Sequence, residues 1–121
     1  MDADRINFDS IRAAEEALDQ IGSGNSRLMA GRAIHINILI RQVPGPEARH
    51  LKVAYNEIGA EAAVNKQVYA REEGAATDMV VMGTIYQHRE VRRILADDPV
   101  IRPWLNAIEA VVENCREATD A

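Results

Sequence analysis

The chain has 121 residues, an apolar fraction of 47%, a charged fraction of 27% and a net charge of −5 at neutral pH. This composition is typical of one globular domain, taken as residues 1–121, and argues against a disordered chain. The acidic balance argues against a nucleic-acid partner, because a nucleic-acid binder needs a basic surface to displace counterions.

The compartment is predicted from what the chain lacks. No apolar run approaches the length that spans a bilayer, so no membrane partner is expected. Residues 1–5 are acidic, whereas a signal peptide starts with basic and then apolar residues. Cys115 is the single cysteine, so an internal disulfide is impossible. These features favour a cytoplasmic protein.

Charge is distributed unevenly along the chain. Residues 1–26 carry six acidic and two basic side chains, residues 27–71 carry three acidic and seven basic ones, and residues 72–121 carry ten acidic and five basic ones. The positive middle can therefore pair with the acidic ends, either within one chain or across a dimer.

The first predicted element is a clear helix, whereas the second segment fits either a helix or a strand. Apolar side chains three and four residues apart predict a helix over residues 7–21, which a glycine-rich turn ends. Residues 26–43 fit two patterns, because every second side chain from Ile34 to Ile40 is isoleucine, as in a strand, while Leu28, Leu39 and Val43 also fit a helix. We favour a buried helix, because a strand needs partners and few others are indicated.

Three further helices are predicted. One covers residues 46–73, with Pro46 in its first turn, and would be about 40 Å long. The next covers residues 77–96, although its first residues also read as a short strand that ends at Gly83. The last covers residues 99–118 and has one broad apolar stripe.

The expected fold is all-α, an antiparallel bundle of four to five helices joined by short loops. The alternative is an α+β fold with short strands near residues 33–41 and 78–84. The helix over residues 46–73 is longer than such a monomer needs, so we expect its overhanging apolar face to be buried in a homodimer.

No motif in the sequence assigns a catalytic, cofactor-binding or metal-binding residue. His35, His50 and His88 lie on three different predicted helices and have no metal-binding partner at helical spacing. Nucleophile-elbow, phosphate-loop and dinucleotide-binding motifs are not found, and adjacent carboxylates point to different helix faces. Enzymatic activity is therefore left open, with a non-enzymatic function favoured and no cofactor or metal expected.

One basic cluster is a candidate binding face. Arg89, Arg92 and Arg93 are spaced at i, i+3 and i+4, so they share one face of a helix and can dock an acidic partner or a phosphate. The other interpretation is a solvated face, in which the three arginines pair with nearby carboxylates such as Glu90.

The favoured function is a small helical protein–protein interaction module, such as a regulator, adaptor or inhibitor, that acts as a homodimer. The alternative is a small helical enzyme or ligand-binding protein whose site lies between helices or at a dimer seam. Its pocket would be lined by Arg32, His35 and Arg41 from the apolar second segment. A third possibility is a structural subunit of a larger assembly.

Overall fold

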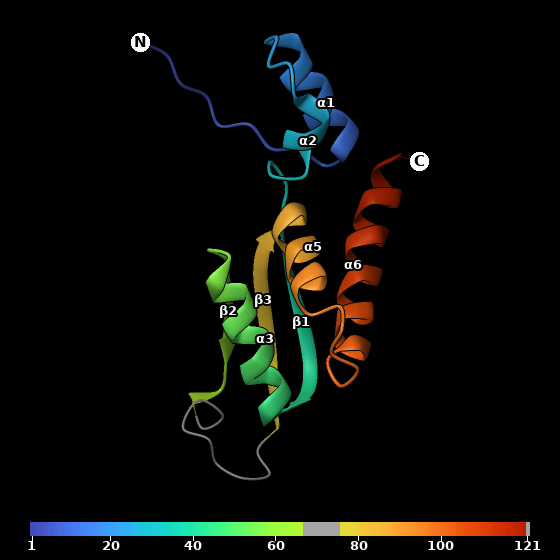
Figure 1. Cartoon of the computed structure of the whole chain (residues 1–121). Coiled ribbons are helices and arrows are strands. Elements are labelled where there is room, and N and C mark those ends of the chain that lie inside the picture. The colour runs from blue at the N-terminus through green and yellow to red at the C-terminus, as the bar shows by residue number, and fades with distance from the viewer. Residues whose placement is uncertain (67–75, 121) are drawn as a thin grey trace.

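The computed structural model describes residues 1–66 and 76–120, and it contains a three-stranded antiparallel sheet (Figure 1). The strands are β1 (His35–Pro44), β2 (Glu61–Val64) and β3 (Ala76–Thr84), in the order β1-β3-β2. The expected all-α bundle is therefore wrong. Because β1 and β2 both run antiparallel to β3, they run parallel to each other.

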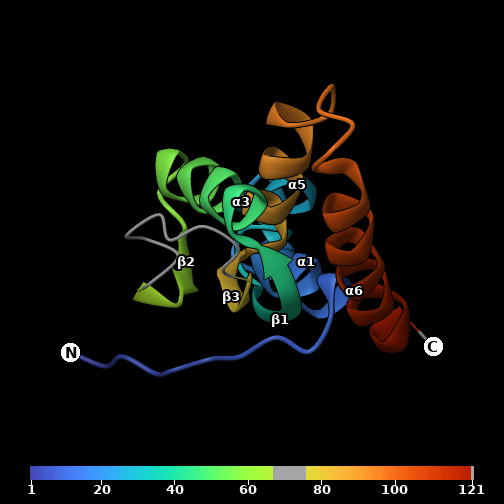
Figure 2. The ribbon, with the colours of Figure 1, turned by 90° about the horizontal axis from the view of Figure 1, so that it is seen from below.

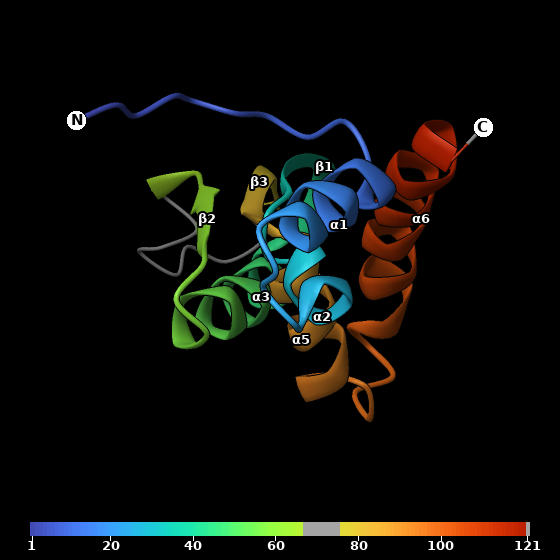
Figure 3. The same cartoon turned by 90° about the horizontal axis from the view of Figure 1, so that it is seen from above.

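Five helices accompany the sheet in the described part of the chain: α1 (Ile11–Gln20), α2 (Ser26–Ala30), α3 (Gly45–Glu57), α5 (Ile85–Ile94) and α6 (Arg102–Asp120). Figures 1 and 2 show α3, α5 and α6 on one side of the sheet. Figure 3 shows α1 and α2 together at the end of the molecule where β1 begins and β3 ends. No helix in residues 1–66 or 76–120 is long and apolar enough to cross a membrane.

β1 follows the alternation seen in the sequence, with one irregularity. Every second side chain from Ile36 to Ile40 is buried under the helices. The register against β3 then shifts before Val43, where Gln42 takes a φ of 57° and donates its backbone N–H to the Asp78 carboxylate at 3.0 Å. This bulge places two buried side chains three residues apart, so that the end of a strand has a helix-like spacing.

The other corrections concern the three middle segments. The predicted helix over residues 26–43 is wrong, because this range holds the short helix α2 followed by most of strand β1. The predicted helix over residues 46–73 is right for α3, but Gly59, with a φ of 80°, turns the chain into β2; residues 67–73 lie outside the described residues. The predicted helix over residues 77–96 is wrong for the part that forms β3 and right for α5.

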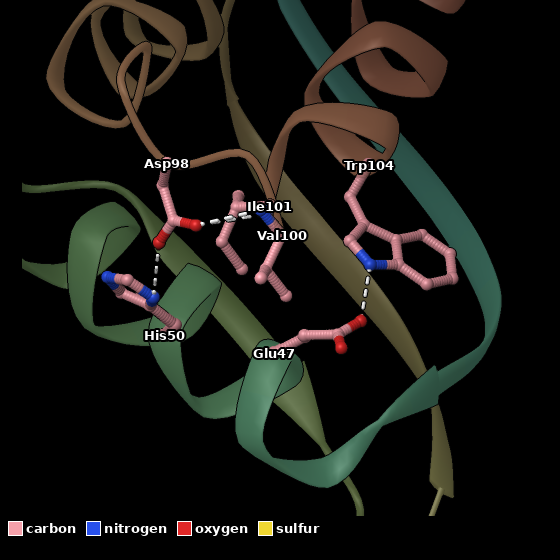
Figure 4. Close-up of polar contacts among 6 residues, drawn as sticks. All are labelled: Glu47, His50, Asp98, Val100, Ile101 and Trp104. Atoms are coloured by element: carbon pink, nitrogen blue, oxygen red, sulfur yellow. Dashed lines mark hydrogen bonds and ion pairs between the residues drawn. The ribbon is translucent and has the colours of Figure 1, made fainter.

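The first and last predicted helices are confirmed as α1 and α6. α6 is held against the start of α3 by polar contacts (Figure 4). The indole N–H of Trp104 donates to the Glu47 carboxylate at 2.6 Å, and His50 contacts Asp98 at 3.3 Å. The same Asp98 carboxylate accepts the backbone N–H of Val100 at 3.0 Å, which shapes the turn before α6.

Tyr55 of α3 and His88 of α5 form a buried polar pair under the sheet. The Tyr55 hydroxyl lies 2.8 Å from His88 Nδ1, and His88 Nε2 lies 2.8 Å from the carbonyl oxygen of Ile36 in β1. A carbonyl oxygen only accepts, so Nε2 carries the proton and Nδ1 accepts the tyrosine hydroxyl. Burial lowers the pKa of His88 and raises that of Tyr55, so both groups are held neutral.

Acidification is expected to destabilise the protein through His88. Its pKa in the folded chain lies below the ordinary value of 6.5, so the unfolded chain takes up the proton first. The stability that neutral His88 contributes is full above pH 6.5 and is lost as the pH falls from there toward the folded pKa.

Urea unfolding at pH about 7.5 and about 5.5 measures this loss. His88→Gln is the control, because an amide hydrogen-bonds without titrating in this range. Its unfolding free energy should fall less between the two pH values than that of the original chain. Equal losses in both proteins would remove His88 as the cause.

Candidate functional site

A hollow of about 520 Å³ lies between α1, α2 and the first turns of α5. Its volume falls in the range of about 300–1,000 Å³ that is usual for ligand sites. α1 contributes Ile11, Arg12 and Glu15, which lie on one side of the helix. The Ser10 side chain accepts the backbone N–H of Ala13 at 2.9 Å, which caps α1 and fixes where this side begins.

The start of α5 forms the floor of this hollow and is tightly held. The backbone N–H of Tyr86 donates to the Gly31 carbonyl at 2.9 Å, and that of Ile85 donates to the Ile34 carbonyl at 3.0 Å. Thr84 and Gln87 form a reciprocal capping box at the same helix end. The donors at this end are thereby satisfied, so the floor is preorganised rather than formed on binding.

Apolar side chains are exposed at the edge of the hollow. Leu28 of α2 is 77% exposed and Tyr86 of α5 is 40% exposed. The Arg32 guanidinium lies 4.2 Å from the centre of the Tyr86 ring, a cation–π contact that restricts the ring. An exposed leucine beside a restrained tyrosine is a combination that favours contact with another molecule, because tyrosine is enriched at binding hot spots.

The charged groups of the hollow divide into satisfied and unsatisfied ones. Arg89 lies 2.8 Å from Glu113 and 3.6 Å from Glu109, so two carboxylates of α6 already hold its guanidinium. Arg12 and Arg27 are exposed, and neither guanidinium forms a hydrogen bond or ion pair with residues 1–66 or 76–114, whose side chains the structure describes. Two guanidiniums are therefore available to an incoming group.

The other carboxylates that line the hollow neutralise little of the positive charge of Arg12 and Arg27. Glu90 pairs with Arg93 at 2.8 Å, and the hydrogen bond from Arg93 lowers the pKa of Glu90. Glu15 is half-buried at the α1 side. The hollow thus offers two free cations against one carboxylate, Glu15, which favours an anionic group on an otherwise apolar ligand.

The three arginines predicted to form a partner-binding face have different surroundings. Arg89 lines the hollow but is held by α6 carboxylates. Arg92 donates to the Leu105 carbonyl at 3.1 Å and to the Asn106 side chain at 3.2 Å, which docks α5 on α6. Arg93 is exposed and pairs within its own helix. They do not present three free guanidiniums on one face.

The three residues predicted to line an alternative pocket are not brought together. Arg32 stacks on Tyr86 beside the hollow. His35 and Arg41 lie on the exposed face of β1, six residues apart, which is roughly 20 Å along a strand. His35 contacts the neighbouring Asn37 side chain at 2.8 Å rather than a group from another element.

The three histidines also lie apart. His88 is buried with both ring nitrogens engaged, His50 contacts Asp98, and His35 contacts Asn37. Among the described residues, no three histidine, cysteine, aspartate or glutamate side chains gather closely enough to hold a metal ion.

The outer face of the sheet is a second exposed surface. α3, α5 and α6 lie on the other side of the sheet (Figure 2). A shallower hollow of about 250 Å³ lies on the strands, beside Leu39, Ala63 and Val80. Leu39 is 50% exposed, and the register places it next to Val80. This surface is apolar but has few charges that would specify a partner.

The candidate site residues that sequence patterns missed are Arg12, Arg27, Leu28 and Tyr86. Leu28 was assigned to the apolar face of a helix over residues 26–43, whereas α2 ends before Gly31 and leaves Leu28 exposed. Gly31 was the available signal, because glycine commonly follows a helix end.

No protein family model, curated protein or solved structure matches this chain.

Proposed function

We propose that this chain is a protein-interaction module, and that the hollow between α1, α2 and α5 binds a partner segment with one large apolar side chain flanked by carboxylates. The observation that carries the proposal is that Arg12 and Arg27, whose guanidiniums have no partner among the described side chains, line the same hollow as exposed Leu28 and Tyr86. A regulator, adaptor or inhibitor needs this kind of binding site and no catalytic group.

The apolar part of the hollow supports binding through burial. Leu28 and Tyr86 are already largely exposed, so covering them removes apolar area from water at about 25 cal/mol per Å². The backbone contacts of Ile85 and Tyr86 fix the floor before a partner arrives. Little conformational entropy is then lost on binding, which favours affinity.

The charged part of the hollow supports specificity. Guanidinium groups form planar, two-point hydrogen bonds with carboxylates, and such pairs are stronger than neutral hydrogen bonds. Arg12 comes from α1 and Arg27 from α2, so they approach a bound segment from two elements. A segment without carboxylates would leave both cations partly desolvated and unpaired, which disfavours it.

Oligomeric state and compartment remain proposals. A helix over residues 46–73 would have left an apolar face for a homodimer to bury, but α3 ends at Glu57. A homodimer would therefore have to form through other surfaces. The cytoplasmic setting is retained as a prediction from the sequence.

Selection from a displayed peptide library tests the proposed site. Peptides enriched on the original chain should carry a large apolar side chain next to aspartate or glutamate. Their affinity for an R12E/R27E variant should fall roughly ten- to a hundredfold or more, because carboxylates then face carboxylates. Fluorescence anisotropy with the enriched peptides measures this ratio.

The matched control is R41E/K66E, which makes the same change of net charge at two exposed positions outside the hollow. Its affinity for the selected peptides should stay close to that of the original chain. If R12E/R27E and R41E/K66E lose affinity equally, net charge rather than the hollow governs binding, and the proposed site is refuted.

A further inference from the structure

Residues 1–7, which precede α1, form an exposed segment that we name the arm. Every arm residue is exposed, and Ile6 is 67% exposed. Phe8 ends the arm, because its partly buried side chain packs against the core. Seven extended residues reach about 23 Å from this anchor.

The chemistry of the arm matches what the hollow is proposed to bind. Ile6 supplies a large apolar side chain, and Asp2 and Asp4 supply two carboxylates on the same short segment. Arg5 adds one cation, for which the hollow has Glu15. The side chains of the arm therefore offer two large apolar groups, Met1 and Ile6, with two anions and one cation, to a site with exposed apolar groups, two free cations and one carboxylate.

The arm points away from the hollow of its own chain. In Figures 2 and 3 it leaves α1 on the side opposite α5, and in Figure 3 it also runs away from α2. To enter its own hollow, the arm would have to reverse direction just before Phe8, whose side chain is packed against the core. A hollow on a second copy needs no such reversal.

We infer that the arm of one copy binds in the α1–α2–α5 hollow of a second copy, with Ile6 over the apolar floor and Asp2 and Asp4 on Arg12 and Arg27. This inference rests on the proposed function of the hollow and names its partner. If the exchange is reciprocal, two identical contacts close a two-fold dimer and leave no open end.

Charge reversal with complementation tests this inference. Variant D2K/D4K reverses the arm and variant R12E/R27E reverses the hollow, and all four positions are exposed, so the fold should be unchanged in circular dichroism. Sedimentation velocity should show association of the original chain. Each variant alone should lose at least about a hundredfold in association constant, because like charges face each other.

An equimolar mixture of the two variants should associate again. In the mixed pair each arm meets a hollow of opposite charge, whereas in either pure variant it does not. Loss of association in both variants, with recovery of association in their mixture, would establish arm exchange. A monomeric original chain, variants that still associate, or a mixture that stays monomeric would each overturn it.

A peptide of residues 1–9 separates this inference from the proposed function. It should bind a chain that lacks residues 1–7, and R12E/R27E should abolish that binding. If library peptides require Arg12 and Arg27 but the arm peptide does not bind, the hollow keeps its function and arm exchange is wrong. If neither binds there, both fail. If the shortened chain binds the arm peptide tightly but the full chain is monomeric, the arm covers its own hollow. That result contradicts exchange between copies.

Discussion

His88→Leu is expected to lower the free energy of unfolding by about 3 kcal/mol. Leucine fills most of the imidazole space, but the Tyr55 hydroxyl and the Ile36 carbonyl both lose their partner inside the core. Each buried polar group left without a partner costs about 1–3 kcal/mol. Urea denaturation followed by circular dichroism measures the change.

The matched control is the double variant Tyr55→Phe with His88→Leu. It removes the hydroxyl as well, so the Ile36 carbonyl still loses its partner but no tyrosine hydroxyl is orphaned beside it. The double variant should therefore be less destabilised than the sum of the two single variants predicts. Strict additivity would show that the tyrosine and the histidine do not interact and would contradict the assigned hydrogen bond.

Ile38→Lys is expected to abolish stable folding, whereas Leu39→Lys should change stability by about 0.5 kcal/mol or less. Ile38 is 4% exposed under the helices, while its neighbour Leu39 is 50% exposed on the outer face of the sheet. A lysine at the first position buries an unpaired charge, which costs about 4 kcal/mol or more. That is a large share of the roughly 5–15 kcal/mol that stabilises a typical domain.

This pair of substitutions distinguishes a strand from the buried helix that the sequence also permits. In a helix buried on most sides, a lysine at either position would lower the stability of the protein by a similar amount. Equal losses of stability in the two variants, measured by thermal unfolding, would contradict the strand. Leu39→Lys should also bind library peptides normally, because it lies on the sheet and outside the hollow.

The sheet was hard to predict because the sequence indicates few partner strands and because β1 has a bulge. Isoleucines at alternate positions point to a strand, but Ile40 and Val43 are both buried and three residues apart. The left-handed φ of Gln42 and its hydrogen bond to Asp78 create this spacing. The partner lies 36 positions away in the sequence, so local patterns do not contain the cause.

The predicted helix over residues 46–73 was wrong just beyond α3 for a related reason. α3 (Gly45–Glu57) has a strong helical start, and no proline follows to mark an end. Gly59 was the sole local signal for the turn, and its φ of 80° uses the freedom that glycine alone has at low cost. β2 has four residues, and its pairing with β3 rather than its own propensity makes it a strand.

Terminal helices were predictable because their signals are local. Ser10 caps α1 with its side chain, and Asp98 holds the turn before α6. The candidate site was less accessible, since Arg12, Arg27 and Tyr86 come from three separated elements. Sequence patterns grouped arginines along one helix, whereas the fold engages Arg89 and Arg92 in holding α5 on α6.

Amide NMR spectra during titration with a library-selected peptide test the proposed binding site most directly. The largest shift changes are predicted for residues of α1, α2 and the first turn of α5, with Arg12, Arg27, Leu28 and Tyr86 among them. Amides of β1 and β3 around Leu39 and Val80 should change little. Shift changes concentrated on that outer sheet face, with an unaffected hollow, would contradict the proposal and would place the binding surface on the sheet.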